Sequence, residues 1–167
     1  MYKRQNISIE DGLSQATVET MMQDSKGYIW LGTNDGLDRY NGYTFKKYSY
    51  EKGQENSLVN SYILDIKEDS EGNIWVATAA GISKIYDDGE KVQNYTSDSE
   101  SGNLSNDNTA TLLISSSNKI YVGTAEGINL YDKKTDKFNL IYPELKEEYI
   151  NSLAAVSYTH LRAHETK

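Results

Sequence analysis

The side chains that most often carry catalysis are scarce in this chain. The sequence has no cysteine, and its two histidines are His160 and His164. Before residue 154, neither a Ser–His nor a Cys–His pair of nucleophile and base can be formed. Aspartate and glutamate are plentiful, 25 together, but no pair of them stands apart from the repeats described below. We therefore expect no catalytic residue and no enzyme activity in this chain.

Three acidic turns share part of the chemistry of calcium loops. Asp24-x-x-Gly27 and Asp69-x-x-Gly72 place an oxygen donor shortly before a glycine, as does a third turn, Asp87-Asp88-Gly89, but the twelve-residue loop that ends in glutamate is absent. Turn chemistry explains both residue types, since aspartate accepts hydrogen bonds from the backbone ahead of it and glycine supplies a positive φ. The lack of cysteine excludes thiolate metal sites. We expect neither a metal nor a cofactor.

Composition excludes several classes of protein. The chain has 167 residues and a formal net charge of −8, and this acidic balance without a basic cluster argues against nucleic-acid binding. No run of about 18 apolar residues is present, so we expect no membrane contact by this segment. The first residues also lack the pattern of a secretory leader. Fourteen tyrosines favour a core that relies on half-buried sheets, because a buried tyrosine hydroxyl needs a partner.

One pattern recurs three times, over residues 23–48, 68–95 and 115–141. Trp30, Trp75 and Tyr121 lie 45 and 46 residues apart. The same spacing relates Leu13, Leu58 and Leu104; Thr33, Thr78 and Thr124; and Gly36, Gly81 and Gly127. Four aligned columns indicate a repeat architecture.

Each unit predicts four short strands. The second strand, over 28–33 in the first unit, has large apolar side chains on both faces and should be buried on both. The third strand begins at the repeated glycine. Asn41-Gly42 and Asp88-Gly89 then predict tight two-residue hairpins, and 133–136 a longer turn. Asn118 replaces the turn glycine of the third unit and tolerates the same left-handed backbone.

Four antiparallel strands per unit of about 45 residues are typical of β-propeller blades. We therefore predict an all-β fold of about three four-stranded antiparallel blades. Because propellers close with ~4–8 blades, we expect an incomplete part of a larger propeller. Residues 1–14 should supply the end strand of a preceding blade and a loop leading onward. The blades should span 15–58, 59–104 and 105–153, the last including the start of the next repeat.

Residues 154–167 have no place in the repeats. They resemble a translated sequencing adapter, and we hypothesise that they are not native.

Ligand recognition is expected in the loops that differ while the rest of the unit repeats. These loops join the second and third strands (34–35, 79–80, 125–126) and lead into the first strands (15–16, 60–62, 106–108). In a propeller both sets usually open at the same end, and their polar residues would suit a small molecule or a glycan. The candidate ligand-binding residues are Asn34, Asp35, Tyr62, Asn108 and Glu126. Trp30 and Trp75 lie within strands and are predicted to pack between blades.

The motif D-S-x-G-x-I-W-x-x-T-x-x-G-(L/I) resembles the two-component regulator propeller repeat. It is carried by Asp24, Ser25, Gly27, Ile29, Trp30, Thr33, Gly36 and Leu37, and by Asp69, Ser70, Gly72, Ile74, Trp75, Thr78, Gly81 and Ile82. The third unit departs from it at Ser115, Asn118 and Tyr121. The resemblance covers residues 1 to about 153. It implies a sensor region on the periplasmic or extracellular side of the membrane, in a receptor whose output is a histidine kinase or diguanylate cyclase.

We therefore predict a ligand-sensing input fragment of a bacterial membrane-bound receptor of the two-component type, non-catalytic by itself. We expect the parent receptor to self-associate. The alternative is a propeller interaction scaffold without signalling output. A propeller lyase or hydrolase would need histidines or metal ligands in further blades.

Overall fold

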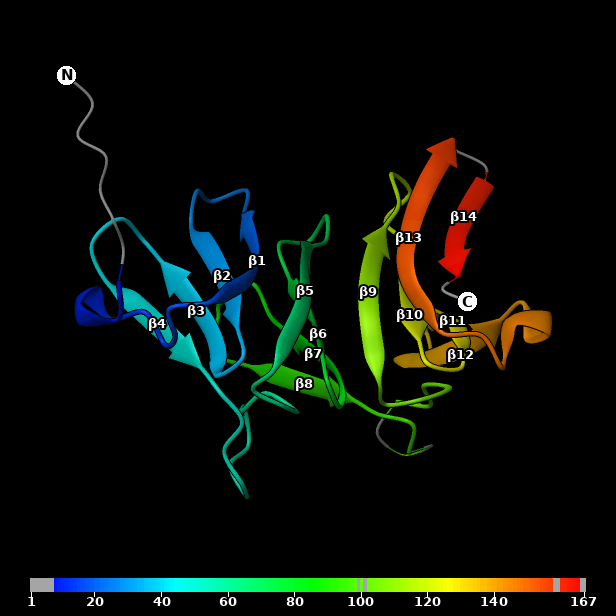
Figure 1. The fold of residues 1–167 in the computed structure, drawn as a ribbon, viewed down its shortest axis with the longest axis horizontal. Coiled ribbons are helices and arrows are strands. Elements are labelled where there is room, and N and C mark those ends of the chain that lie inside the picture. Colours follow the sequence, from blue (N-terminus) through cyan, green and yellow to red (C-terminus); the bar gives the residue numbers. More distant parts are fainter. Residues whose placement is uncertain (1–7, 99, 101, 158–159, 166–167) are drawn as a thin grey trace.

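The regular secondary structure of the chain is almost entirely antiparallel strand (Figure 1), and the computed structural model describes residues 8–98, 100, 102–157 and 160–165. The first sheet contains β1 (Val18–Gln23), β2 (Ile29–Thr33), β3 (Gly36–Tyr40) and β4 (Phe45–Tyr48). The second contains β5 (Ile63–Glu68), β6 (Ile74–Thr78), β7 (Gly81–Ile85) and β8 (Val92–Tyr95). The third contains β9 (Thr109–Ile114), β10 (Ile120–Thr124), β11 (Gly127–Asp132) and β12 (Lys137–Ile141). Each sheet follows chain order, so the predicted all-β fold with three four-stranded blades is confirmed.

The remaining elements are two single turns and a two-stranded sheet. The 3-10 turns η1 (Ile9–Asp11) and η2 (Pro143–Leu145) precede the first and last sheets, and β13 (Ile150–Ser157) pairs with β14 (His160–Glu165). The end strand expected near the N-terminus falls largely on residues 1–7, which lie outside the described residues. The described part of the chain has no helix with the length and apolarity that a membrane crossing requires. The end of β13 and all of β14 lie within residues 154–167. The non-native origin of these residues stays a hypothesis.

The blades stand side by side in chain order, with the first strands β1, β5, β9 and β13 as neighbours (Figure 1). Glycine in the second strand allows this close approach. A Cβ at Gly32 would lie 2.6 Å from Cγ2 of Ile63, and one at Gly123 would lie 2.6 Å from the carbonyl oxygen of Ile150. Ile63 and Ile150 are both fully buried. β13 therefore sits against the third blade as β5 sits against the first.

Two apolar cores lie between the blades and confirm the predicted packing of the tryptophans. The first core joins Trp30, Leu37 and Tyr48 to Leu58, Ile63, Ile66, Ile74, Val76, Ile85 and Val92. The second joins Trp75, Ala77, Ile82 and Tyr95 to Leu104, Leu112, Ile120, Val122 and Phe138. Trp30 stacks on Tyr48 with ring centroids 5.5 Å apart, and Trp75 stacks on Tyr95 at 5.7 Å. Each tryptophan thus packs in the core between its own blade and the next one.

The tight two-residue hairpins predicted from Asn41-Gly42 and Asp88-Gly89 are wrong. Tyr40 pairs with Phe45, which leaves four residues in the first loop, and Ile85 pairs with Val92, which leaves six in the second. Asn41 does not adopt the positive φ that a type I′ turn requires. Its Oδ1 instead accepts hydrogen bonds from the backbone N–H groups of residues 43 and 44. In the second loop Asp88 Oδ1 does the same for residues 90 and 91.

The repeated threonine and glycine columns build the turn between the second and third strands. Thr33 Oγ1 donates to the Gly36 carbonyl at 2.9 Å and accepts from the Asp35 N–H at 3.1 Å. Gly36 has φ 131°, and a Cβ there would lie 2.8 Å from the Tyr48 carbonyl oxygen. Both residue types therefore serve the turn, which presents the variable residues between them.

Candidate functional site

The two sets of variable loops meet at one end of the sheets. We call this end the loop rim; it comprises residues 34–35, 79–80 and 125–126 together with 15–16, 60–62 and 106–108. In the second blade the Ala79 N–H donates to the Tyr62 carbonyl at 3.1 Å. In the third the Ala125 N–H donates to the Asn108 carbonyl at 2.9 Å. In the first blade the Gln15 side chain takes over this role and accepts from the Asn34 N–H at 3.2 Å.

Most of the candidate side chains on the loop rim are free to meet a ligand. Asn34, Asp35 and Asn108 are exposed, and Tyr62 is 42% exposed. Within the described residues, these four use only backbone groups in their hydrogen bonds. Glu126 differs, because it is half-buried and accepts a hydrogen bond from Asn106 at 3.0 Å. The hydrogen bonds thus join the two loops of each blade, so that each blade presents its own candidates at the loop rim.

A buried acceptor in the third strand fixes the start of each entering segment. Asp38, Ser83 and Asn129 are fully buried. They accept hydrogen bonds from the backbone N–H groups of residues 14, 59 and 105 at 2.7, 3.0 and 3.0 Å. This column could not be recognised in the sequence because the residue type changes in every unit. What these three acceptors share is a constant separation of 24 residues from the residue whose backbone N–H they bind.

At the opposite end of the first two sheets, an aspartate in the turn accepts a hydrogen bond from the tryptophan of the same blade. Asp24 Oδ1 accepts from the backbone N–H of Tyr28 at 2.9 Å, as the predicted turn chemistry requires. Its Oδ2 also accepts from Trp30 Nε1 at 2.7 Å. Asp69 makes the equivalent bond to Trp75 at 2.8 Å. This second role was missed, although aspartate and tryptophan share one spacing in two units and disappear together from the third.

Replacing Asp69 by alanine is expected to lower the free energy of unfolding by about 3 kcal/mol, because it leaves buried donors without an acceptor. The donors are the indole of Trp75 and the side-chain amide and backbone N–H of Asn73. Urea unfolding followed by circular dichroism measures the loss. The matched control is Asp35→Ala on the exposed loop rim, which should change stability by less than about 0.5 kcal/mol. Equal effects of both substitutions would contradict the structural role of Asp69.

The sequence itself matches a known family. Residues 12–35 and 57–80 match the two-component regulator propeller family. A protein named histidine kinase P4 from Formosa agariphila is 53% identical over 38 residues, which are 23% of this chain and 3% of the kinase. The match therefore spans only a small part of that relative.

Solved structures show the same fold. The extracellular domain of a hybrid two-component system from B. thetaiotaomicron aligns with a TM-score of 0.84 and 24% identity, over 95% of this chain and 23% of that one. Virginiamycin B lyase from Staphylococcus aureus aligns with a TM-score of 0.61 and 16% identity, over 85% of this chain and 46% of the lyase. At these identities the likeness concerns the fold alone. The fold is thus shared by an extracellular signalling domain and by an enzyme.

Proposed function

Because this chain carries repeats of the two-component regulator propeller family, we propose that it is a ligand-sensing input segment of a bacterial membrane-bound receptor. It acts without catalysis of its own, on the periplasmic or extracellular side of the membrane. The observation that carries the proposal is the loop rim, where Asn34, Asp35, Tyr62 and Asn108 present side chains not engaged with other described residues.

The contrast between the rim and the repeated positions supports recognition at the rim. The repeated tryptophan, threonine and leucine positions are buried in the first two blades. The rim residues vary between units, and four of the five candidates are exposed. Variable side chains held on a rigid scaffold are the usual arrangement of a binding surface. A small polar molecule or a glycan suits the amide, carboxylate and phenol groups found there.

Ligand binding would alter signalling by favouring one arrangement of the parent receptor. A ligand shifts such an equilibrium only by its difference in affinity for the two states. A ligand that contacts loops of adjacent blades would favour the state in which those loops lie at the right separation. Self-association of the parent receptor would then carry the shift to the output module.

The complete reading frame tests this proposal against a scaffold without output. We expect a membrane-spanning helix after the propeller repeats, followed by a histidine kinase or diguanylate cyclase module. Sequencing of the genomic locus gives the answer directly. A reading frame that stops after the repeats, with no membrane helix or output module, would contradict a receptor and support the scaffold.

A further inference from the structure

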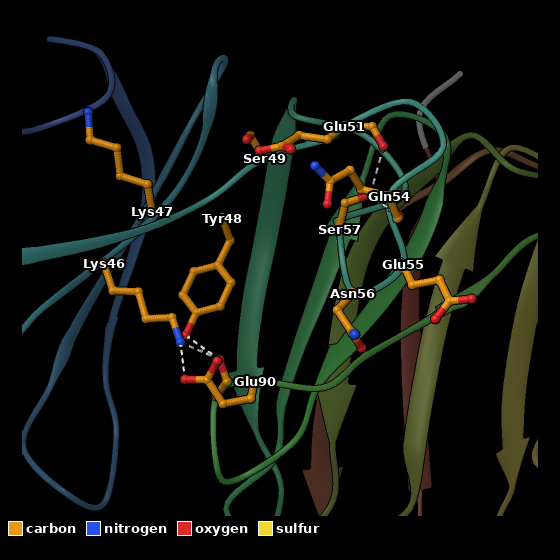
Figure 2. Close-up of a pocket in the computed structure, with 11 residues that line it drawn as sticks. Lys46, Lys47, Tyr48, Ser49, Glu51, Gln54, Glu55, Asn56, Ser57 and Glu90 are labelled. Atoms are coloured by element: carbon orange, nitrogen blue, oxygen red, sulfur yellow. Dashed lines mark hydrogen bonds and ion pairs between the residues drawn. The ribbon is translucent and has the colours of Figure 1, made fainter.

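A cavity of about 340 Å³ opens between the first and second blades (Figure 2), and none of the candidate residues of the loop rim lines it. One wall is β4 and the opposite wall is the connector 49–57, which leads to the second blade. Gly89 and Glu90, in the turn between β7 and β8, form the third side. Two blades and a connector therefore border one cavity that is open to solvent.

Two opposite charges, Lys46 on the β4 wall and Glu90 on the third side, form an accessible ion pair. Lys46 Nζ lies 2.6 Å from Glu90 Oε1 and 2.8 Å from the Gly89 carbonyl oxygen. The Lys46 side chain is 35% exposed and that of Glu90 is 77% exposed. Figure 2 shows Tyr48 and Lys46 on one side and the Gln54 amide extending from the connector. Within the described residues that amide has no hydrogen-bond partner, so it offers a donor and an acceptor.

The second connector, 96–103, has described residues that lie close against the neighbouring strands. There the Gly102 carbonyl accepts from the Phe138 N–H at 2.8 Å, and Asn103 Nδ2 donates to the Phe138 carbonyl at 3.2 Å. A Cβ at Gly102 would lie 2.7 Å from the Tyr95 Cα, so the connector lies directly on the strand. The first connector, 49–57, is one residue longer than its counterpart 96–103. Among the described residues, the second connector thus packs directly on β8 at Gly102, whereas residues of the first connector line a cavity.

We propose that this cavity binds a small zwitterion, a molecule with an ammonium and a carboxylate group a few bonds apart. Its carboxylate takes a place beside Lys46 Nζ, and its ammonium lies against the Glu90 carboxylate. One exposed ion pair is then replaced by two charge-assisted contacts, and the Gln54 amide completes the polar enclosure. A simple anion would meet Glu90 and a simple cation would meet Lys46, so either leaves one like-charged neighbour. The cavity is at the small end of the ~300–1,000 Å³ range of ligand pockets.

Isothermal titration calorimetry on the intact chain tests the proposal with zwitterions of increasing charge separation. The probes are glycine, β-alanine, 4-aminobutyrate and 6-aminohexanoate, compared with acetate, methylammonium and sorbitol. We expect saturable binding that peaks at one chain length and is at least about tenfold tighter than that of acetate or methylammonium. Lys46→Met and Glu90→Gln should each weaken the best zwitterion by at least about tenfold. Lys52→Met, on the same connector but outside the cavity lining, should leave binding unchanged.

Three results would overturn the proposal. They are the absence of saturable binding by every zwitterion, sorbitol or acetate binding as tightly as the best zwitterion, and unchanged affinity in both Lys46→Met and Glu90→Gln. Urea unfolding of these variants controls for folding, because an exposed ion pair contributes only about 0–1 kcal/mol. The measurement uses this chain alone and residues outside the loop rim. Its failure would therefore leave the proposed sensing role at the rim untouched.

Discussion

Replacing Trp75 by alanine is expected to lower the free energy of unfolding by about 3–5 kcal/mol. The indole is fully buried and packs against Tyr95, Tyr131 and Phe138 in the core between the second and third blades. Its N–H also donates to Asp69 at 2.8 Å. Removal therefore leaves both a cavity and a buried carboxylate with one partner fewer. A loss of this size is a large fraction of the ~5–15 kcal/mol that stabilises a typical domain.

Urea unfolding followed by far-ultraviolet circular dichroism measures this loss, with two variants as controls. Trp75→Phe keeps an aromatic ring and loses the hydrogen bond. Its free energy of unfolding should therefore lie between that of the unsubstituted chain and that of Trp75→Ala. Tyr43→Ala removes a ring that is 91% exposed and should change stability by less than about 0.5 kcal/mol. If Trp75→Ala proved as mild as Tyr43→Ala, the tryptophan would not hold the blades together.

Raising the pH above 10 is expected to destabilise the folded chain through its buried tyrosines. Burial raises the pKa of Tyr48 to about 12. Burial also raises the pKa of Tyr95 and Tyr131, and hydrogen bonding to the Asp136 carboxylate adds to both effects. The unfolded chain releases these protons first, near the usual tyrosine pKa of about 10. The stability that these un-ionised tyrosines contribute is therefore fully present below pH 10. It falls as the pH rises toward 12, by about 2 kcal/mol for Tyr48 alone.

The free energy of unfolding measured in urea from pH 8 to pH 12 tests this dependence. The Tyr48→Phe variant cannot ionise at this position, so its stability should fall by about 2 kcal/mol less than that of the native chain over the same range. Tyr43→Phe alters an exposed phenol and should follow the native profile. A native profile that stays flat up to pH 12 would show that the buried hydroxyls ionise as freely as exposed ones.

The fold could be predicted from the sequence because its main determinants repeat with a constant residue type. Trp30 and Trp75 mark the buried second strand, and Thr33 and Gly36 mark the turn that follows it. A pattern of this kind depends on local backbone preference and burial alone. Asn118 illustrates it well, since the residue chosen for its tolerance of the left-handed region has φ 58°.

The predictions that were wrong or missing concern interactions between residues, which no single sequence position reveals. Asn41-Gly42 has the residue types of a tight hairpin, but the stacking of Tyr40 on Phe45, with centroids 4.7 Å apart, accompanies a wider loop. Asp38, Ser83 and Asn129 act alike as buried acceptors although their residue types differ. The cavity beside Lys46 is lined by the connector 49–57, which is one residue longer than the connector 96–103. The sequence shows this difference in length but does not show where the longer connector leaves a cavity.

The most direct test of ligand recognition at the loop rim is the response of the complete receptor to substitutions there. The ligand is first identified by screening glycans and small molecules against the complete sensor region, and receptor output is then measured with a transcriptional or phosphorylation assay. With Asn34, Asp35 and Tyr62 replaced by alanine together, the ligand concentration needed for half-maximal output should rise at least about tenfold, as expected for the loss of several polar contacts. Tyr43→Ala, exposed outside the rim, should respond as the native receptor does. Unchanged binding and output in the triple variant would contradict recognition at the loop rim.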